Sequence, residues 1–348
     1  MAALVILANG DSELGAYYVS WGTLAGGIAQ LSLVWWAVRK TGFLPRFRLP
    51  RFDRDVRRFW VLALPAIASG GITQINIFIG TIIASGASGA ISYLYYADRL
   101  YQLPLGIIGI AIGVVLLPEL SRHLKGGRDR EAQTAMDQSL LISMLLALPA
   151  AAGLIALSEP IIRILFERGA FSAADTEATS AALVAFAAGL PAFILIKVFQ
   201  PGFFAREDTA TPTWFSAVSV AVNIALSLLL FPTLQHVGIA IATTVSAWAN
   251  AGLLFATLWR KGHYRPSARQ GRKQALMLAS AAALLLLLWY SARALAGVFA
   301  AGAALLPAAL ALAGLIAIGG VLYFAALHVT GVQNLRSFAA MLTQRKPS

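Results

Sequence analysis

Residues 90–117 read AISYLYYADRLYQLPLGIIGIAIGVVLL, and this stretch decides the fold. Its charged residues are the adjacent pair Asp98 and Arg99, and the rest of the run is largely apolar. A helix rises about 1.5 Å per residue, so about 20 apolar residues can cross a hydrocarbon core of about 30 Å. We therefore predict a membrane-spanning helix with a charged pair inside it.

The composition of the whole chain agrees with this interpretation. Of 348 residues, 59% are hydrophobic and 12% are charged, and the mean hydropathy is +0.74. This balance cannot cover a soluble domain with enough polar surface. The chain has no cysteine, which excludes disulfide bonds, thiol catalysis and zinc-thiolate sites.

Eight further apolar runs are bounded by charged or turn residues. They cover approximately 14–38, 59–85, 138–157, 178–200, 213–231, 238–258, 275–296 and 303–330. With 90–117 they predict an all-α, polytopic bundle of about nine membrane helices. Residues 1–9 are apolar but too short to span a membrane, and they lack the basic start of a signal peptide. We expect them to be the last turns of a helix whose beginning is missing.

The basic residues predict how the bundle is oriented. The chain has 27 Lys and Arg against 15 Asp and Glu. Of the basic residues, 22 lie in one alternate set of loops, namely 39–58, 118–137, 201–212, 259–274 and the C-terminal tail, and three lie in the opposite set. By the positive-inside rule, the first set and the C-terminus are cytoplasmic. The basic loop 39–58 is expected to fix topology and attract anionic membrane lipids, and nucleic acid is not an expected partner.

Arg99 is the most costly residue in its helix. It lies roughly 15 Å from the outer end of the segment, and a charge at mid-membrane costs at least about 2.5 to 3.5 kcal/mol. Such a residue normally faces a bundle interior or a water-filled cavity. Asp98 is its neighbour, but side chains at i and i+1 point about 100° apart and cannot form a simple same-face pair. Gln102, four residues after Asp98, is expected to share one polar face with the pair.

Two interpretations of Arg99 stay open. A guanidinium keeps its proton and presents a planar fork of donors, which suits a phosphate or a carboxylate. In the first interpretation Arg99, Asp98 and Gln102 bind an anionic substrate. In the second, Arg99 forms a buried structural pair with an acid on another helix.

Other polar residues are weaker candidates. Lys197 lies three residues before the predicted end of its helix, so its stem can reach the cytoplasmic interface. Gln74, Asn76, Asn223 and Thr243 are uncharged groups that can join helices through hydrogen bonds of about 0.6 to 2 kcal/mol. We keep Gln74, Asn76 and Lys197 as weaker candidates for substrate binding.

Catalytic motifs are absent from the sequence. It has no HExxH, no GxSxG, no GxxxxGK[ST] and no pair of membrane acids like a protease dyad. We therefore expect neither an enzyme nor a chain with catalytic residues, a metal site or a cofactor. Transport driven by ATP bound to this chain is not expected either.

Three stretches carry a resemblance to a known family. They are YYADRLYQLPLGIIGIAIGVVLLPELSR (95–122), LFERGAFSAADT (165–176) and KVFQPGFFAREDTATP (197–212). In order, spacing and loop side they resemble the MurJ/MviN family of lipid II flippases, within the multidrug/oligosaccharidyl-lipid/polysaccharide exporter superfamily. That family typically has fourteen helices in two six-helix lobes around a cationic cavity, with two extra C-terminal helices. The resemblance implies that this chain contains the sixth to fourteenth helices and lacks most of the N-terminal lobe.

The resemblance also implies a division of the chain into parts. These are a remnant of the N-terminal lobe (1–58), a six-helix C-terminal lobe (59–258), two extra helices that line a groove for a lipid tail (259–330) and a cytoplasmic tail (331–348).

The resemblance assigns roles to single residues as well. Arg99 matches a cavity arginine of the family's eighth helix, and Asp98 matches its acidic neighbour. Asn223 and Thr243 match positions that hold sodium in some relatives and are the candidates for an ion site. However, Gly80 and Ser227 stand where acids would lie, so sodium binding is not predicted.

The function implied by the resemblance is transport of lipid II, the undecaprenyl-pyrophosphate-linked disaccharide peptide, across the bacterial inner membrane by alternating access. Its expected partners are lipid II, membrane lipids and the missing N-terminal lobe, without which this chain is expected to be inactive. Two alternatives stay open. One is an exporter of another lipid-linked sugar or of a drug, and the other is a membrane scaffold that transports nothing.

Overall fold

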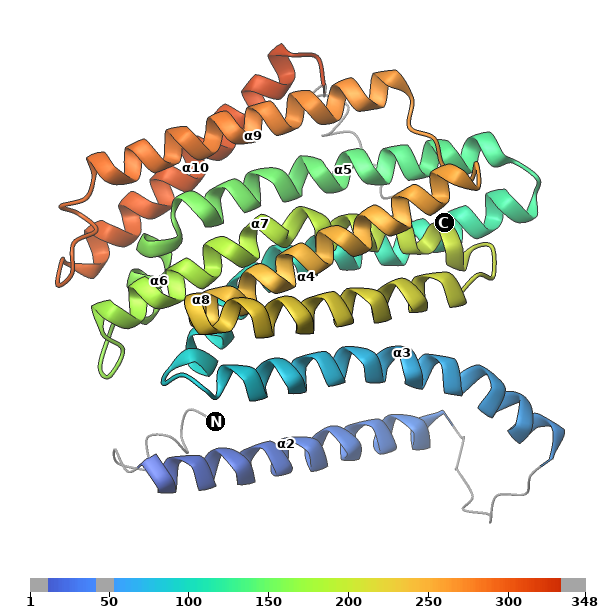
Figure 1. The fold of residues 1–348 in the computed structure, drawn as a ribbon, viewed down its shortest axis with the longest axis horizontal. Coiled ribbons are helices and arrows are strands. Elements are labelled where there is room, and N and C mark those ends of the chain that lie inside the picture. Colours follow the sequence, from blue (N-terminus) through green and yellow to red (C-terminus); the bar gives the residue numbers. More distant parts are fainter. Residues whose placement is uncertain (1–11, 42–52, 333–348) are drawn as a thin grey trace. The chain divides into compact units, whose positions relative to one another are not determined.

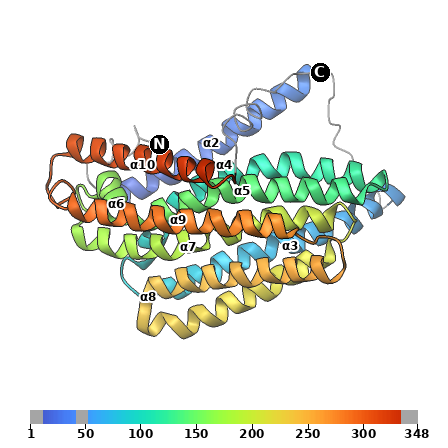
Figure 2. The same cartoon turned by 90° about the horizontal axis from the view of Figure 1, so that it is seen from above.

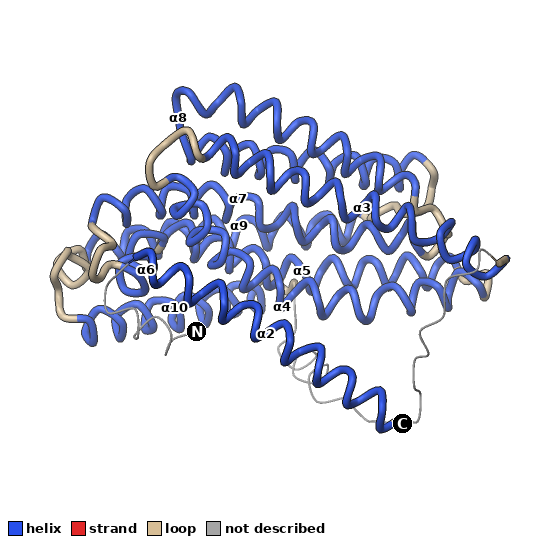
Figure 3. The backbone as a smooth tube through the Cα atoms, turned by 90° about the horizontal axis from the view of Figure 1, so that it is seen from below, coloured by secondary structure: helices blue, strands red, loops and turns tan. Residues whose placement is uncertain are grey.

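The structure is a computed structural model that describes residues 12–41 and 53–332. Within these ranges the backbone forms helices, turns and loops, and no β-strand (Figure 3). The chain divides into two compact units, residues 1–63 and 64–348, which we describe separately. Our predictions for residues 1–9, most of loop 39–58 and nearly all of the tail 331–348 lie outside the described residues.

The first unit contains helix α2 (Ser12–Lys40). The charged groups of Arg39 and Lys40 in its last turn lie 5.6 and 3.8 Å from the ring centres of Trp35 and Trp36. Cations stacked on indole rings at a helix end are typical of a membrane interface. Helix α3 (Arg54–Ala84) begins in this unit and continues into the second.

The second unit contains seven further helices within its described residues. They are α4 (Ala90–Lys125), α5 (Asp129–Ala156), α6 (Ser158–Phe166), α7 (Ala173–Phe204), α8 (Ala210–Arg260), α9 (Ala268–Ala294) and α10 (Leu305–Val329). α7 lies at the centre and packs against α4, α5 and α8 (Figure 1). Its Leu183, Leu190 and Ile194 are fully buried because neighbours surround this helix. α9 packs on α5, and α10 packs on α9 (Figure 2).

Helix starts in this unit follow from local sequence. Ser172 accepts a hydrogen bond from the backbone N–H of Asp175 at 3.3 Å, and the Asp175 carboxylate accepts one from the Ser172 N–H at 2.7 Å. This reciprocal capping box starts α7. Ser267 caps α9 in a simpler way, by accepting from the Gln270 N–H at 3.2 Å.

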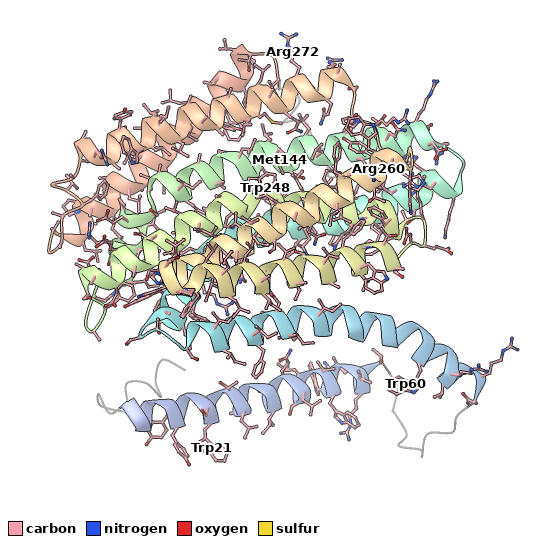
Figure 4. The ribbon with its side chains drawn as sticks, viewed as in Figure 1. Trp21, Trp60, Met144, Trp248, Arg260 and Arg272 are labelled. Atoms are coloured by element: carbon pink, nitrogen blue, oxygen red, sulfur yellow. The ribbon has the colours of Figure 1, made fainter. Side chains whose placement is uncertain are left out.

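α8 is a helical hairpin rather than one straight helix. Its backbone leaves the helical region at Gln235, with φ 48° and ψ −129°, shortly after Pro232. A Cβ atom at Gly238 would lie 2.9 Å from the backbone of Leu230, so only glycine allows the second half to start so close to the first. Trp248, midway along the second half, donates its indole N–H to the Ala188 carbonyl of α7 at 3.1 Å (Figure 4). The halves correspond to the predicted helices 213–231 and 238–258.

The hairpin and the antiparallel neighbours place alternate loops at opposite ends of the second unit (Figure 1). We call the end formed by 126–128, 205–209 and 261–267 the basic end, and the end formed by 85–89, 167–172 and 295–304 the opposite end. Arg260 closes α8 at the basic end, and Arg272 lies in the second turn of α9 (Figure 4). The alternation that the sequence predicted for these loops is confirmed within this unit.

Each predicted membrane segment falls on a helix of the structure. Six helices are long and apolar enough to cross a membrane, by length and composition: α4, α5, α7, α8, α9 and α10. Because α8 folds back on itself, it accounts for two predicted segments. α2 and α3 are not among the six, so their crossing of the membrane stays a prediction from the sequence.

Several helices extend beyond the predicted apolar segments, for one physical reason. Loop 118–137 is mostly helical, because α4 continues to Lys125 and α5 starts at Asp129. α7 likewise continues past residue 200 to Phe204. A helix that leaves the hydrocarbon region keeps its backbone hydrogen bonds while its sequence becomes polar, so the apolar run ends before the helix does.

Candidate functional site

Arg99 lies on an exposed face of α4. The core-facing side of the same helix carries Ala97, Leu100 and Tyr101, which are buried. The guanidinium carbon of Arg99 lies 4.7 Å from the ring centre of Tyr95, a cation–π contact with the preceding turn. Among the residues whose side chains the structure describes, Arg99 forms no ion pair with an acid.

Asp98 and Gln102 form the polar contact that their spacing predicts. The Gln102 side-chain amide donates a hydrogen bond to the Asp98 carboxylate one turn earlier on α4. Two residues further along, Pro104 has no N–H, so the Leu100 carbonyl lacks its usual helical donor. Around Arg99, α4 therefore offers a cation, a paired carboxylate with its amide, and a backbone acceptor.

The weaker candidates do not join Arg99 in one cluster. Lys197 is exposed on α7. A Cβ atom at Gly109 of α4 would lie 3.8 Å from the Lys197 Cγ. The Lys197 side chain therefore runs beside α4, about ten residues after Arg99. Gln74 is exposed on α3. Asn76 is half-buried, and its side-chain oxygen has no hydrogen-bond partner. No hydrogen bond joins Gln74 or Asn76 to Arg99 in the described part of the chain.

Asn223 and Thr243 come together across the α8 hairpin. The buried Asn223 amide donates to the Thr243 hydroxyl at 3.0 Å and lies 3.5 Å from the Ser246 hydroxyl. Ser227, one turn further along, is buried without a hydrogen-bond partner for its hydroxyl. These contacts fit hydrogen bonding between the two halves. No cluster of three His, Cys, Asp or Glu side chains that could hold a metal occurs among the residues described.

The opposite end contains an arginine that the sequence did not single out as a site. Arg163 of α6 donates to Glu167 at 2.9 Å, to Glu159 at 2.7 Å and to the backbone carbonyl of Phe299 at 2.6 Å. Burial lowers the pKa of Arg163, but the hydrogen bonds and charges of the two glutamates outweigh it and leave the pKa raised. This contact attaches the α9–α10 loop to α6. The spacing of Glu159, Arg163 and Glu167 was the available sequence signal.

The basic end has its own cross-loop contact. Lys261, just after α8, lies 3.1 Å from the Asp208 carboxylate, which also accepts hydrogen bonds from the Thr211 N–H and hydroxyl. Burial raises the pKa of Asp208, but these hydrogen bonds and the Lys261 charge prevail and hold the pKa below its usual value. The pKa of His263 is lowered by burial and by the charges of Arg206 and Lys261.

Six long apolar helices define the class as a multi-pass, all-α membrane protein. One of the six, α7, is central and packs against α4, α5 and α8, and the loops alternate between two ends. The family model "Lipid II flippase MurJ" matches residues 1–306. The chain is 55% identical over 254 residues to a probable lipid II flippase MurJ of Rhizobium meliloti (73% of this chain, 48% of that protein). It is 50% identical over 279 residues to one of Rhizobium tropici (80% and 52%).

A solved structure has the same fold. "Lipid II flippase MurJ, inward closed conformation" matches with a TM-score of 0.72 and 22% identity, over 94% of this chain and 65% of that one. The chain belongs to the lipid II flippase MurJ family. It spans about half the length of the curated relatives it matches.

Proposed function

We propose that this chain supplies the C-terminal part of a transporter that moves lipid II from the inner to the outer leaflet of the bacterial cytoplasmic membrane. Membership of the family supports the choice of substrate. One observation supports a direct role for this chain: Arg99 lies exposed on a membrane helix, without an acidic partner in its described surroundings. A pyrophosphate is well suited to a planar cationic fork, which can bind two of its oxygens at once.

The orientation that we propose follows from the two ends of the second unit. Basic residues concentrate at the end that contains loops 126–128, 205–209 and 261–267. In a cytoplasmic membrane this end faces the cytoplasm and the opposite end faces outward. The C-terminus is then cytoplasmic, as is the basic loop 39–58.

The transport cycle that we propose is alternating access. While the cavity is open to the cytoplasm, Arg99 binds the pyrophosphate of lipid II, with the Asp98 and Gln102 pair one turn away. The undecaprenyl tail stays in the bilayer along α9 and α10. Rocking of two lobes against each other then exposes the head group on the outer side. The chain acts by binding and moving its substrate, and it has no catalytic step.

The partner in this cycle is an N-terminal lobe that covers the Arg99 face. Beside Arg99, α4 exposes Leu103, Ile107 and Ile110 at 63%, 75% and 69%. A face that mixes a cation with large apolar side chains is suited neither to water nor to lipid, because the charge alone costs several kcal/mol in hydrocarbon. We expect residues 1–348 to need this lobe for transport.

Complementation tests the proposal. The chain is co-expressed with an N-terminal MurJ fragment in a strain depleted of its own flippase. We expect growth with the unaltered pair, no growth with Arg99→Ala, and severe impairment with Arg99→Lys, because a point charge does not reproduce the guanidinium fork. Arg265→Ala, which removes an exposed arginine at the basic end, is the matched control and should grow normally. Near-normal growth with Arg99→Ala at native expression would contradict the assignment.

Reconstitution tests the need for a second lobe. Liposomes containing the purified chain, labelled lipid II and a quencher outside should show no flipping unless the N-terminal fragment is present. Flipping by the chain alone, lost with Arg99→Ala, would overturn the two-lobe requirement and keep the role of Arg99.

A further inference from the structure

A pocket lies at the opposite end of the second unit, beyond Arg99 along α4. It is a cavity of about 520 Å³ between the start of α4, the end of α6 and the start of α7, and we call it the aromatic pocket. The lining residues that carry the argument are Tyr93, Tyr96, Phe166, Arg168, Phe171 and Asp175. Tyr96 belongs to the stretch 95–122, and Tyr93 lies just before it. The other four belong to the stretch 165–176. The proposed function gives none of these six residues a role.

Three aromatic rings form one wall of the aromatic pocket. Tyr96 lies 4.7 Å from Phe166 and 5.5 Å from Phe171, measured between ring centres, and Phe166 lies 6.1 Å from Phe171. All three side chains are half-buried, so their rings pack together and still face the cavity. Rings held in this way give a rigid apolar platform.

Polar groups line the rim next to these rings. The Tyr93 hydroxyl donates to the Asp175 carboxylate at 2.7 Å, and the Tyr93 ring lies 5.1 Å from the buried His236. Tyr93 is therefore fixed from two sides. Arg168 is exposed, and its contact in the structure is with the Leu165 carbonyl, so most of its donors remain available. The rim thus offers hydroxyl, carboxylate and guanidinium groups together.

This combination of groups selects a class of ligand. A pyranose ring has an apolar face of C–H groups that stacks on an aromatic ring, and hydroxyls around its edge that both donate and accept hydrogen bonds. The carboxylate and the guanidinium in the rim carry opposite charges, which does not favour a pyrophosphate. The rim is also too polar for a hydrocarbon tail. The volume lies within the usual range for small-ligand sites, about 300 to 1,000 Å³.

The spacing along α4 fits the chemistry of a lipid-linked sugar. At about 1.5 Å per residue, Tyr96 lies about 4.5 Å and Tyr93 about 9 Å from Arg99 along the helix axis, toward the opposite end. The first sugar of such a lipid is bonded directly to the pyrophosphate. A head group held at Arg99 by its pyrophosphate can therefore place its sugars toward the aromatic pocket.

We propose that the aromatic pocket is a carbohydrate subsite, which stacks a pyranose ring of the transported head group on the Tyr96, Phe166 and Phe171 wall as the head reaches the outer side. The identity of the sugar rests on the proposed function. Arg168 and the Tyr93–Asp175 pair bind the hydroxyls of the sugar and the amide of its N-acetyl group. The pocket therefore contributes to recognition of the saccharide, and Arg99 to recognition of the pyrophosphate.

Ligand-observed NMR with a sugar that has no phosphate tests this subsite alone. The probe is the soluble disaccharide N,N′-diacetylchitobiose, added to the complete chain in lipid nanodiscs. We expect saturation transfer strongest at the ring C–H protons, with no displacement by excess inorganic pyrophosphate. Phe171→Leu, which keeps apolar bulk but removes the ring, and Arg168→Gln should each weaken binding at least fivefold, and Phe171→Tyr should retain it.

Matched controls lie outside the aromatic pocket. Tyr290→Leu removes an exposed aromatic ring from α9, and Arg293→Gln removes an exposed cation at the opposite end. Both should bind the disaccharide as the unaltered chain does. Absence of transfer to the disaccharide, displacement by pyrophosphate, or equal weakening by the control variants would overturn the subsite. Complementation with Arg99 variants is a separate measurement, so failure of the sugar test leaves the transport proposal standing.

Discussion

Replacing Arg163 with alanine should reduce the stability of the second unit more than any single surface ion pair would. Its guanidinium joins α6 to the α9–α10 loop through two glutamates and the Phe299 carbonyl. The side chains of Arg163 and Glu167 are 19% and 13% exposed, whereas that of Glu159 is 55% exposed. The pair with Glu167 is thus the one that is largely shielded from water.

The magnitude follows from these exposures. Removing one partner of a buried ion pair costs about 3 to 5 kcal/mol, and an exposed pair contributes about 0 to 1 kcal/mol. Arg163 and Glu167 are partly solvated, and Glu167 keeps a hydrogen bond of 2.7 Å from the Thr176 hydroxyl. We therefore expect about 3 kcal/mol for Arg163→Ala and less than about 1 kcal/mol for Glu159→Ala.

Reversible unfolding in mixed detergent and SDS micelles, followed by circular dichroism, measures both losses. Amide exchange in residues 295–304 should rise in Arg163→Ala and stay unchanged in Glu159→Ala, because only the first variant releases Phe299. A loss below about 1 kcal/mol, or equal losses in both variants, would refute the view that Arg163 attaches the loop.

Three further predictions concern packing, pH and helix contacts. A Cβ atom at Gly189 would lie 2.6 Å from the Thr244 hydroxyl, so Gly189→Ala should lower the free energy of unfolding by about 1 to 3 kcal/mol. Gly252 has open space around it, so Gly252→Ala should leave the free energy of unfolding unchanged. The same unfolding assay checks both variants. Because the pKa of Asp208 is lowered in the folded state, its carboxylate stabilises the fold above its ordinary pKa near 4, and this stabilisation is lost as pH falls through the lower folded value. The free energy of unfolding of the unaltered chain should therefore fall by less than about 1 kcal/mol in this acid range. This fall should be missing in Asp208→Asn when unfolding is measured against pH. Asn223→Ala should cost about 0.6 to 2 kcal/mol through its contact across the α8 hairpin, and an unchanged stability would count against that contact.

The long apolar runs made the membrane helices predictable from the sequence. Each run set the place of a helix, but the polar ends of α4 and α7 extend beyond the runs that marked them. α6 was missed because a helix of nine residues with one buried face has neither the length nor the uniform hydropathy of a spanning segment. The gap between the runs 213–231 and 238–258 predicted the break in α8, but the positive φ of Gln235 was not predicted.

The site was predictable only where its contacts are local. Asp98 and Gln102 are one turn apart, and the structure joins them as their spacing indicates. The contact from Tyr96 to Phe171 spans 75 residues of sequence, and the hydrogen bond from Arg163 to Phe299 spans 136. Such contacts depend on how helices pack, which a single sequence does not specify. The position of Lys197 was also only partly predictable. The apolar run placed Lys197 three residues before the end of its helix, but α7 continues to Phe204.

The tight turn of α8 has a consequence for how the protein is made. The residues from Phe231 to Gly238 carry no Lys, Arg, Asp or Glu, and Gly238 lies against Leu230 with no room to spare. The first half of α8 has no charged group at this end to hold it across the bilayer by itself during synthesis. We expect the two halves to enter the membrane together, as one paired hairpin.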